Sequence, residues 1–84
     1  MPAPPGALVL YHRVADPESA RIRTWIVERG LKPRIDFQNV DTEGAEAFVS
    51  LGARRVPALW DGTALHEGAE AISAALGAIM RTEE

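Results

Sequence analysis

The sequence predicts an α/β domain with a mixed four-stranded sheet flanked by helices, because three patterns follow one another along its 84 residues. A short, continuous apolar run at residues 7–11 is typical of a strand that is buried on both faces of a parallel sheet. From Ala20 onward the apolar residues recur at helical spacing. An Asp-Gly pair at residues 61–62 separates two strand-like runs and indicates a β-hairpin.

The first helix has clear start and stop signals. Asp16 is a favoured N-cap residue, and Pro17 suits the first helical position. Gly30 can take the left-handed conformation after the last turn, and Leu31 can supply the apolar contact that accompanies it. Between these signals the apolar stripe consists of Ile22, Trp25 and Ile26.

The remaining elements alternate between strand and helix periods. Residues 35–38 alternate between apolar and polar side chains, which predicts a second strand. A short helix then follows, with Asp41 or Thr42 as its cap. Its predicted apolar stripe is Ala45, Phe48 and Val49.

The C-terminal part is predicted to form a hairpin and a last helix. Strands at residues 56–60 and 63–66 flank the Asp-Gly pair, for which we expect a type I′ turn. The last helical stripe consists of Ala69, Ile72, Ala75, Leu76 and Ile79. The resulting order is βαβαββα, in which the βαβ unit implies parallel pairing and the hairpin implies antiparallel pairing.

Composition limits the functional classes. With 46% hydrophobic and 25% charged residues, the chain is predicted to form one globular domain over residues 7–84, after a flexible leader at residues 1–6. Neither a signal peptide nor a membrane-spanning run is evident, so we expect a cytoplasmic protein without a membrane partner. The net charge of −3 and the scattered arginines argue against nucleic-acid binding.

Three short motifs resemble those of a known family. They are Asp-Pro-Glu-Ser at residues 16–19, Arg-Val-Pro at 55–57 and Glu-Gly-Ala-Glu-Ala at 67–71. Their order and spacing resemble those of glutaredoxins, members of the thioredoxin superfamily, over nearly the whole chain. The resemblance implies a thioredoxin-like fold with a cis peptide bond before Pro57. The same segments are similar to the N-terminal domain of glutathione S-transferases.

The redox motif of that family is missing here. In the family a Cys-x-x-Cys motif occupies the place of residues 16–19, but this chain contains no cysteine. A carboxylate cannot form a mixed disulfide and a serine hydroxyl cannot resolve one, so we expect no thiol–disulfide oxidoreductase. Asp16 is expected to act as an N-cap, because a helix N-terminus lowers the pKa that a general base would need raised. Ser19 is expected to be a first-turn hydroxyl, since no base is evident for it.

The resemblance implies a glutathione site in which two charged side chains take part. Arg13 matches a lysine that pairs with the glycine carboxylate, and Glu70 matches an acidic residue that faces the γ-glutamyl amine. The alternative interpretation is that both are solvated surface charges.

Backbone groups complete the implied site. The Val56 backbone, next to Pro57, matches the segment that pairs with the cysteinyl unit of glutathione. The free N–H groups near Ala69 at the start of the last helix suit the other carboxylate. Arg55 either adds an anion contact or pairs with Asp16 and closes the site.

A metal site is not expected. His12 and His66, with Asp16 or Glu67, supply ligand atoms, but their positions lack any close ligand spacing.

The sequence therefore predicts a redox-inactive, glutaredoxin-like binding or regulatory module with affinity for glutathione or a similar small anion. One alternative is an enzyme similar to glutathione S-transferases that uses Ser19 and is completed by a partner chain. Another alternative is a purely structural domain that serves protein–protein contact.

Overall fold

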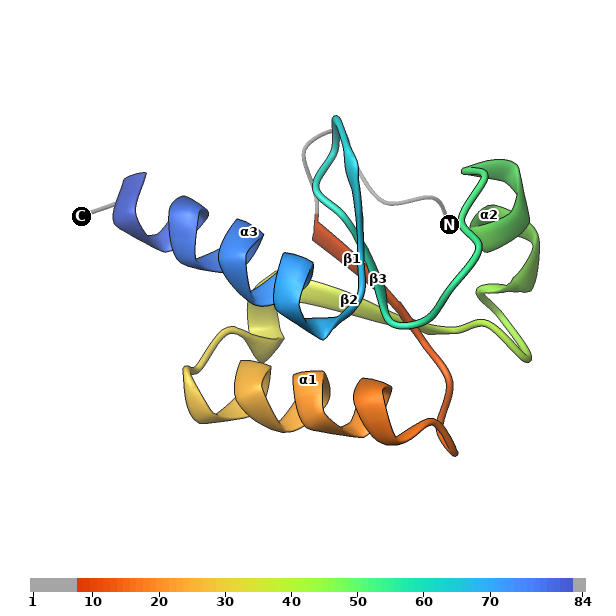
Figure 1. Ribbon diagram of the computed structural model, residues 1–84, viewed down its shortest axis with the longest axis horizontal. Coiled ribbons are helices and arrows are strands. Elements are labelled where there is room, and N and C mark those ends of the chain that lie inside the picture. Colours follow the sequence, from red (N-terminus) through yellow and green to blue (C-terminus); the bar gives the residue numbers. More distant parts are fainter. Residues whose placement is uncertain (1–7, 83–84) are drawn as a thin grey trace.

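A mixed four-stranded sheet with helices on both faces organises the molecule (Figure 1). The computed structural model describes residues 8–82, so the predicted leader at residues 1–6 lies outside the described residues. The elements are β1 (Leu8–His12), α1 (Pro17–Glu28), a 3₁₀ turn η1 (Lys32–Arg34), β2 (Ile35–Asn39), α2 (Ala45–Ser50), β3 (Ala58–Trp60), β4 (Leu65–Glu67) and α3 (Ala69–Thr82).

The strands lie in the order β2-β1-β3-β4. β1 pairs in parallel with β2, with Leu10 opposite Phe37, and antiparallel with β3, with Leu10 opposite Leu59. β3 and β4 form an antiparallel hairpin. The prediction of a mixed four-stranded α/β sheet is confirmed.

The predicted burial of the first strand on both faces is also confirmed, because β1 contributes to two separate apolar clusters. Leu8 and Leu10 belong to the cluster on the side of α1 and α3, whose other buried members are Ile22, Ile26, Leu31, Ile35, Leu59, Ile72 and Leu76. Val9 and Tyr11 belong to the cluster on the side of α2, against which Phe48 and Leu51 pack. Figure 1 shows α1 and α3 on one side of the sheet and α2 away from them.

The start and stop signals of α1 act as predicted. The Asp16 carboxylate accepts a hydrogen bond from the Ser19 amide at 2.7 Å, and Pro17 occupies the first turn. At the other end Gly30 has a φ of 69°, and the Leu31 amide donates to the Ile26 carbonyl at 3.1 Å. This arrangement satisfies a carbonyl of the last turn.

The predicted cap of α2 is wrong, and its predicted apolar stripe is confirmed only at Phe48. Gly44 is the N-cap residue and no side chain caps the helix. Asp41 instead pairs with Arg13, and both of its carboxylate oxygens lie 3.2 Å from Nε of the arginine. Ala45 and Val49 are exposed, Val49 to 74%, because this six-residue helix packs only its Phe48 side, partly buried, against the sheet.

The hairpin forms, but its predicted type I′ turn is wrong. Trp60 pairs with Leu65, so four residues connect the strands. A type I′ turn needs a positive φ at both central residues, and Asp61 does not have one. Its carboxylate instead accepts hydrogen bonds from the Thr63 and Ala64 amides at 2.8 and 2.7 Å. The hydrogen bonds of the Asp61 side chain, and not a type I′ turn, therefore hold the loop between β3 and β4.

Candidate functional site

The first turn of α1 holds the two motif positions that the sequence singled out. Ser19 is fully buried, and its hydroxyl oxygen accepts a hydrogen bond from the Arg13 amide at 3.3 Å. Its own amide donates to Asp16. Both side chains thus fasten the loop between β1 and α1, and a substrate cannot reach the Ser19 hydroxyl.

The capping bond predicts a measurable pH dependence. The hydrogen bond from the Ser19 amide lowers the pKa of Asp16. Because the folded-state pKa lies below the unfolded value of about 3.9, this contribution to stability is full above that value and is lost as the pH falls through the folded pKa.

We expect Asp16→Ala to lower the free energy of unfolding by about 0.5–2 kcal/mol at neutral pH, as measured by urea denaturation. Asp16→Asn, which keeps a good cap without a titrating group, serves as the control. The advantage of the wild type over the Asn variant should shrink as the pH is lowered below about 4. An advantage that does not change with pH contradicts the assignment.

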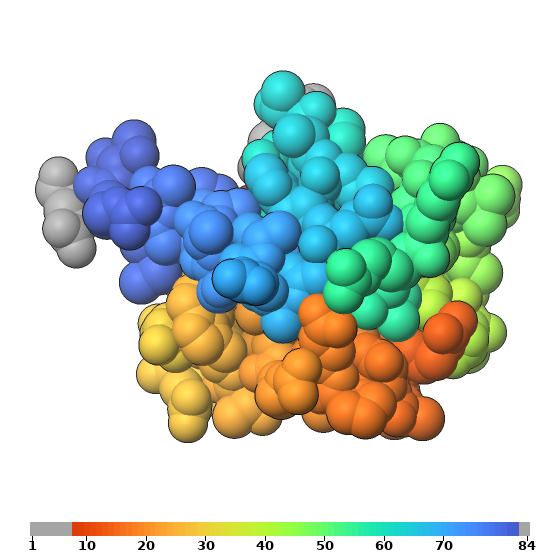
Figure 2. Space-filling model, in the orientation of Figure 1, coloured from red at the N-terminus to blue at the C-terminus, as the bar shows by residue number. Residues whose placement is uncertain are grey.

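Three segments that are distant in the sequence meet at the start of α3. Figure 2 shows the orange start of α1, the green segment that leads into β3 and the blue start of α3 together on one face. Glu18 of α1 joins them, because its Oε2 accepts a hydrogen bond from the Ala69 amide at 2.7 Å. Arg55 Nη2 lies 3.3 and 3.4 Å from the two Glu18 oxygens. A carboxylate therefore sits at the N-terminus of α3, between a backbone donor and a guanidinium.

Of the two alternatives given for Arg55, the pairing with Asp16 is wrong, because Arg55 pairs with Glu18 instead. Asp16 uses its carboxylate for the cap of its own helix. Glu18 lies two residues further along α1 and points its carboxylate at α3. Its side chain is 27% exposed, whereas the Arg55 side chain is 60% exposed.

Glu67 fixes the segment that carries Arg55. Its Oε1 accepts hydrogen bonds from the Arg54 and Arg55 amides at 2.7 and 3.1 Å, and these bonds lower the pKa of the Glu67 carboxyl group. The Gly68 amide in turn donates to the Pro57 carbonyl at 2.8 Å. The end of β4 therefore positions the loop that leads into β3.

Gly68 allows the close approach of these groups. Its φ is 95°, and a Cβ atom at this position would lie 3.3 Å from the Arg55 guanidinium carbon and 3.4 Å from Glu18 Oε2. A side chain here is both strained and crowded. Next to this point, the Val56–Pro57 peptide bond is cis.

An open depression of about 440 Å³ lies beside the Glu18–Arg55 ion pair. Its lining residues are Glu18, Arg55, Glu67, Gly68, Glu70, Ala71 and Ala74. Val56 follows the lining residue Arg55 in the chain, and within residues 8–82 the backbone N–H and C=O of Val56 make no hydrogen bond. Of the six predicted ligand residues, Arg55 and Glu70 line the depression. Pro57 and Ala69 are tied to its lining residues, because the Pro57 carbonyl accepts from the Gly68 amide and the Ala69 amide donates to Glu18.

Arg13 is the predicted ligand residue that the structure does not bring to this depression. Its guanidinium is paired with Asp41, and it does not line the depression. Its backbone amide is held by Ser19.

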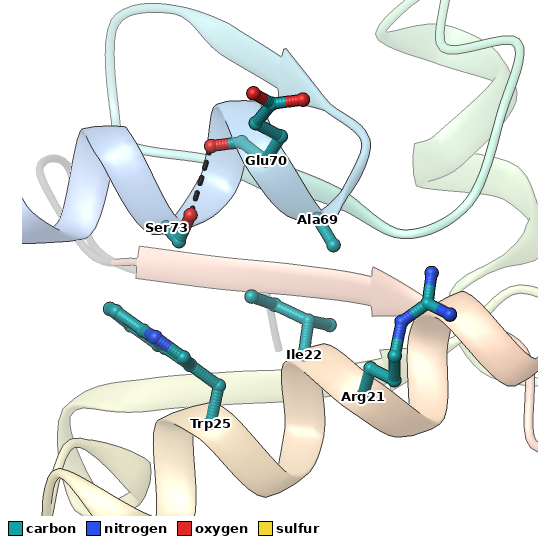
Figure 3. A pocket seen from close by; sticks show the side chains of 6 residues that line it. All are labelled: Arg21, Ile22, Trp25, Ala69, Glu70 and Ser73. Atoms are coloured by element: carbon teal, nitrogen blue, oxygen red, sulfur yellow. Dashed lines mark hydrogen bonds between the residues drawn. The ribbon is translucent and has the colours of Figure 1, made fainter.

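A second hollow, of about 220 Å³, lies between α1 and α3 (Figure 3). Figure 3 shows Arg21, Ile22 and Trp25 rising from α1 toward α3, while the Glu70 carboxylate points away from α1. Trp25 packs against the main core cluster, as predicted, and Arg29 lies 4.0 Å from the centre of its ring.

The two histidines lie in separate contacts. Nδ1 of His12 lies 3.0 Å from Arg23 Nη1, and Nε2 of His66 lies 2.8 Å from Asp61 Oδ2. Within residues 8–82, no three histidine or acidic side chains gather in a way that could hold a metal ion. No helix in this part of the chain is long and apolar enough to cross a membrane.

Comparisons with known proteins give no family. No family model matches the chain, and no curated protein matches it.

Sequence reasoning missed the two residues that organise the site, Glu18 and Glu67. In the sequence, Glu18 stands out only as a member of the motif at residues 16–19, and Glu67 only as a member of the motif at residues 67–71 and as a candidate metal ligand. Both glutamates bond to backbone N–H groups, and Glu18 also pairs with an arginine. An acidic residue in the sequence indicates a possible ion pair or hydrogen bond, but the sequence alone does not identify the residue that forms it.

Proposed function

We propose that this chain is a redox-inactive, glutaredoxin-like domain of the thioredoxin fold that binds a small anionic ligand of the glutathione type. The fold assignment is supported by the parallel pairing of β1 with β2 and the antiparallel β3–β4 hairpin. The positions of the motifs also support it, because residues 55–57 lead into β3 and Ala69 begins α3.

One observation carries the binding function: a carboxylate is held at the start of α3 by the Ala69 amide and the Arg55 guanidinium. A free N–H at a helix N-terminus and a guanidinium together form a suitable donor set for a carboxylate. In the structure that carboxylate belongs to Glu18, and this contact supports the proposal that the same donors suit the anionic end of a ligand.

The groups around the depression fit the rest of such a ligand. The backbone of Val56, which has no hydrogen-bond partner in the described part of the chain, offers one donor and one acceptor for an extended peptide unit. Glu70, exposed on the rim, offers a negative charge for an amine. A γ-glutamyl peptide carries a carboxylate, an amine and peptide groups, which match these three features.

Catalysis through the motif positions is not part of the proposal. Ser19 is fully buried and bonded to the loop, and Asp16 is a helix cap. A nucleophile needs both access to the substrate and a base within hydrogen-bond reach. The proposed domain therefore binds its ligand without transforming it.

Two matched variants of α3 test the binding site. Ala71 and Ala78 are both exposed on this helix, but only Ala71 lines the depression. Reduced glutathione is titrated into isotopically labelled protein, and backbone amide shifts are followed by NMR. We expect saturable shifts at Val56, Ala69 and Glu70.

Ala71→Trp should weaken the binding by roughly tenfold or more, equivalent to about 1.4 kcal/mol, because the indole fills the depression. Ala78→Trp should leave it unchanged. The absence of saturable shifts at millimolar glutathione contradicts the proposed function. Equal weakening by both variants contradicts the location of the site.

A further inference from the structure

Glu18 occupies the position that the carboxylate of the proposed ligand needs. It reaches from the first turn of α1 to the first residue of α3, where its Oε2 lies 2.7 Å from the Ala69 nitrogen. The contact spans 51 positions in the sequence. Its location therefore depends on the packing of α1 beside α3.

The donors at this point cannot serve two carboxylates at once. The Ala69 amide has a single hydrogen, and it is already donated to Glu18. A second carboxylate would add the repulsion of two like charges in contact.

The Glu18 side chain can leave without unfolding its helix. It lies in the first turn of α1, and that turn is held by Asp16 rather than by Glu18. Its partner Arg55 is largely exposed, so the ion pair opens directly to solvent. Such an exposed pair contributes little to stability, which makes exchange with an external anion feasible.

We propose that Glu18 is an internal competitor that closes the ligand site, and that an external carboxylate binds only in molecules whose Glu18 side chain has swung out. This inference rests on the proposed function and adds its regulation. The apparent affinity of the ligand is reduced in proportion to the fraction of molecules in the open state. Removal of the Glu18 carboxylate should therefore strengthen binding.

The test compares Glu18→Ala and Glu18→Gln with the wild type by NMR titration of reduced glutathione. Glu18→Ala should bind roughly tenfold more tightly or better, since it abolishes the charge-assisted contacts to both donors. The affinity of Glu18→Gln for glutathione should lie between those of the wild type and Glu18→Ala, because the Gln amide oxygen still accepts a hydrogen bond from Ala69 but carries no charge. The Gln variant also retains the shape of the side chain. It therefore still tests the inference if the Ala variant does not fold.

Glu28→Ala is the matched control. It removes the same charge from the exposed far end of α1 and touches neither Arg55 nor Ala69. Its affinity for glutathione should equal that of the wild type. A gain in the Glu28 variant as large as the gain in Glu18→Ala would mean that net charge alone causes the effect, and it would overturn the inference.

Acetate separates the two proposals, because it carries only the carboxylate. If wild type and Glu18→Ala bind glutathione equally well, Glu18 is not a competitor, although the proposed function stands. If glutathione binds to neither, but acetate shifts the Ala69 amide in Glu18→Ala and not in the wild type, the competitor is supported and the glutathione function fails. If the Ala69 amide of Glu18→Ala responds to neither probe, both proposals fail.

Discussion

Leu10→Ala is expected to lower the free energy of unfolding by about 2–5 kcal/mol. Leu10 is fully buried in β1, the strand that pairs with both β2 and β3, and it belongs to the cluster beneath α1 and α3. Its truncation removes apolar contacts and leaves a cavity that surrounding elements fill only in part. A chain of this size has a total stability of only about 4–13 kcal/mol, so the loss is a large fraction of it. Urea denaturation followed by circular dichroism measures the change.

Two valines provide the matched comparison for this effect. Val9 is buried in the neighbouring cluster, whereas Val49 is 74% exposed on α2. Val9→Ala should cost about 1.5 kcal/mol or more, because two buried methyl groups are lost. Val49→Ala should change stability by less than about 0.5 kcal/mol. A comparable loss in both valine variants would show that α2 packs with a different face than described.

Asp16→Cys combined with Ser19→Cys is expected to create thiol–disulfide exchange activity in a chain that has no cysteine. Position 16 caps α1, where the free N–H groups and the helix dipole stabilise a thiolate. Cysteines in such places have pKa values of about 3.5–7.5, against about 8.5 for a free thiol. Reduction of a small disulfide substrate, followed by absorbance at slightly acidic pH, measures the gain.

A second cysteine pair controls for the mere presence of two thiols. Thr24→Cys with Val27→Cys places them at the same spacing, on exposed positions in the interior and last turn of α1. These sites lack the free N–H groups of the first turn, so their thiols should keep ordinary pKa values. The pair at 16 and 19 should react at least about tenfold faster at slightly acidic pH, where it alone carries much thiolate. Equal rates would contradict the view that positions 16 and 19 keep the geometry of a redox motif, and they would contradict the proposed glutaredoxin likeness.

The parts of the fold that depend on neighbouring residues could be predicted from the sequence. The cap of α1 at Asp16 and its end at Gly30 follow from local backbone rules, and both are present. The apolar run of β1 likewise predicted burial on two faces. The capping contacts join residues only a few positions apart, so the local pattern contains them. The packing partners of β1 are distant in the sequence, but a continuous apolar run already shows that both faces of the strand need to be covered.

The wrong predictions concern aspartates whose carboxylates bond to groups other than the ones that the local pattern suggests. Asp41 suits a helix cap, but the Arg13 guanidinium holds it. Asp61 suits a primed turn, yet its carboxylate bonds to two loop amides and to His66 instead. For Asp41 a local propensity is outweighed by a charge that only the folded chain brings near. For Asp61 one local hydrogen-bonding pattern replaces another, because its side chain bonds to the amides two and three residues ahead.

The same reason explains why the candidate site was predicted only in part. Arg55 and Ala69 were identified through the resemblance, but their shared partner Glu18 was not. Glu18 lies 37 positions from Arg55, and its place in a first turn already had a sufficient local explanation. The packing of α1 against α3 had to be known before the carboxylate could be placed.

The contact between Arg23 and His12 determines which tautomer the imidazole adopts. A guanidinium only donates, so the Nδ1 atom that faces Arg23 Nη1 at 3.0 Å must offer its lone pair, and the ring hydrogen lies on Nε2. Burial, followed by the charge of Arg23, lowers the pKa of His12, in agreement with a neutral ring. Arg23 also donates to the carbonyls of Arg13 and Val14. One guanidinium thus ties the protonation state of a β1 residue to the conformation of the loop that leads into α1.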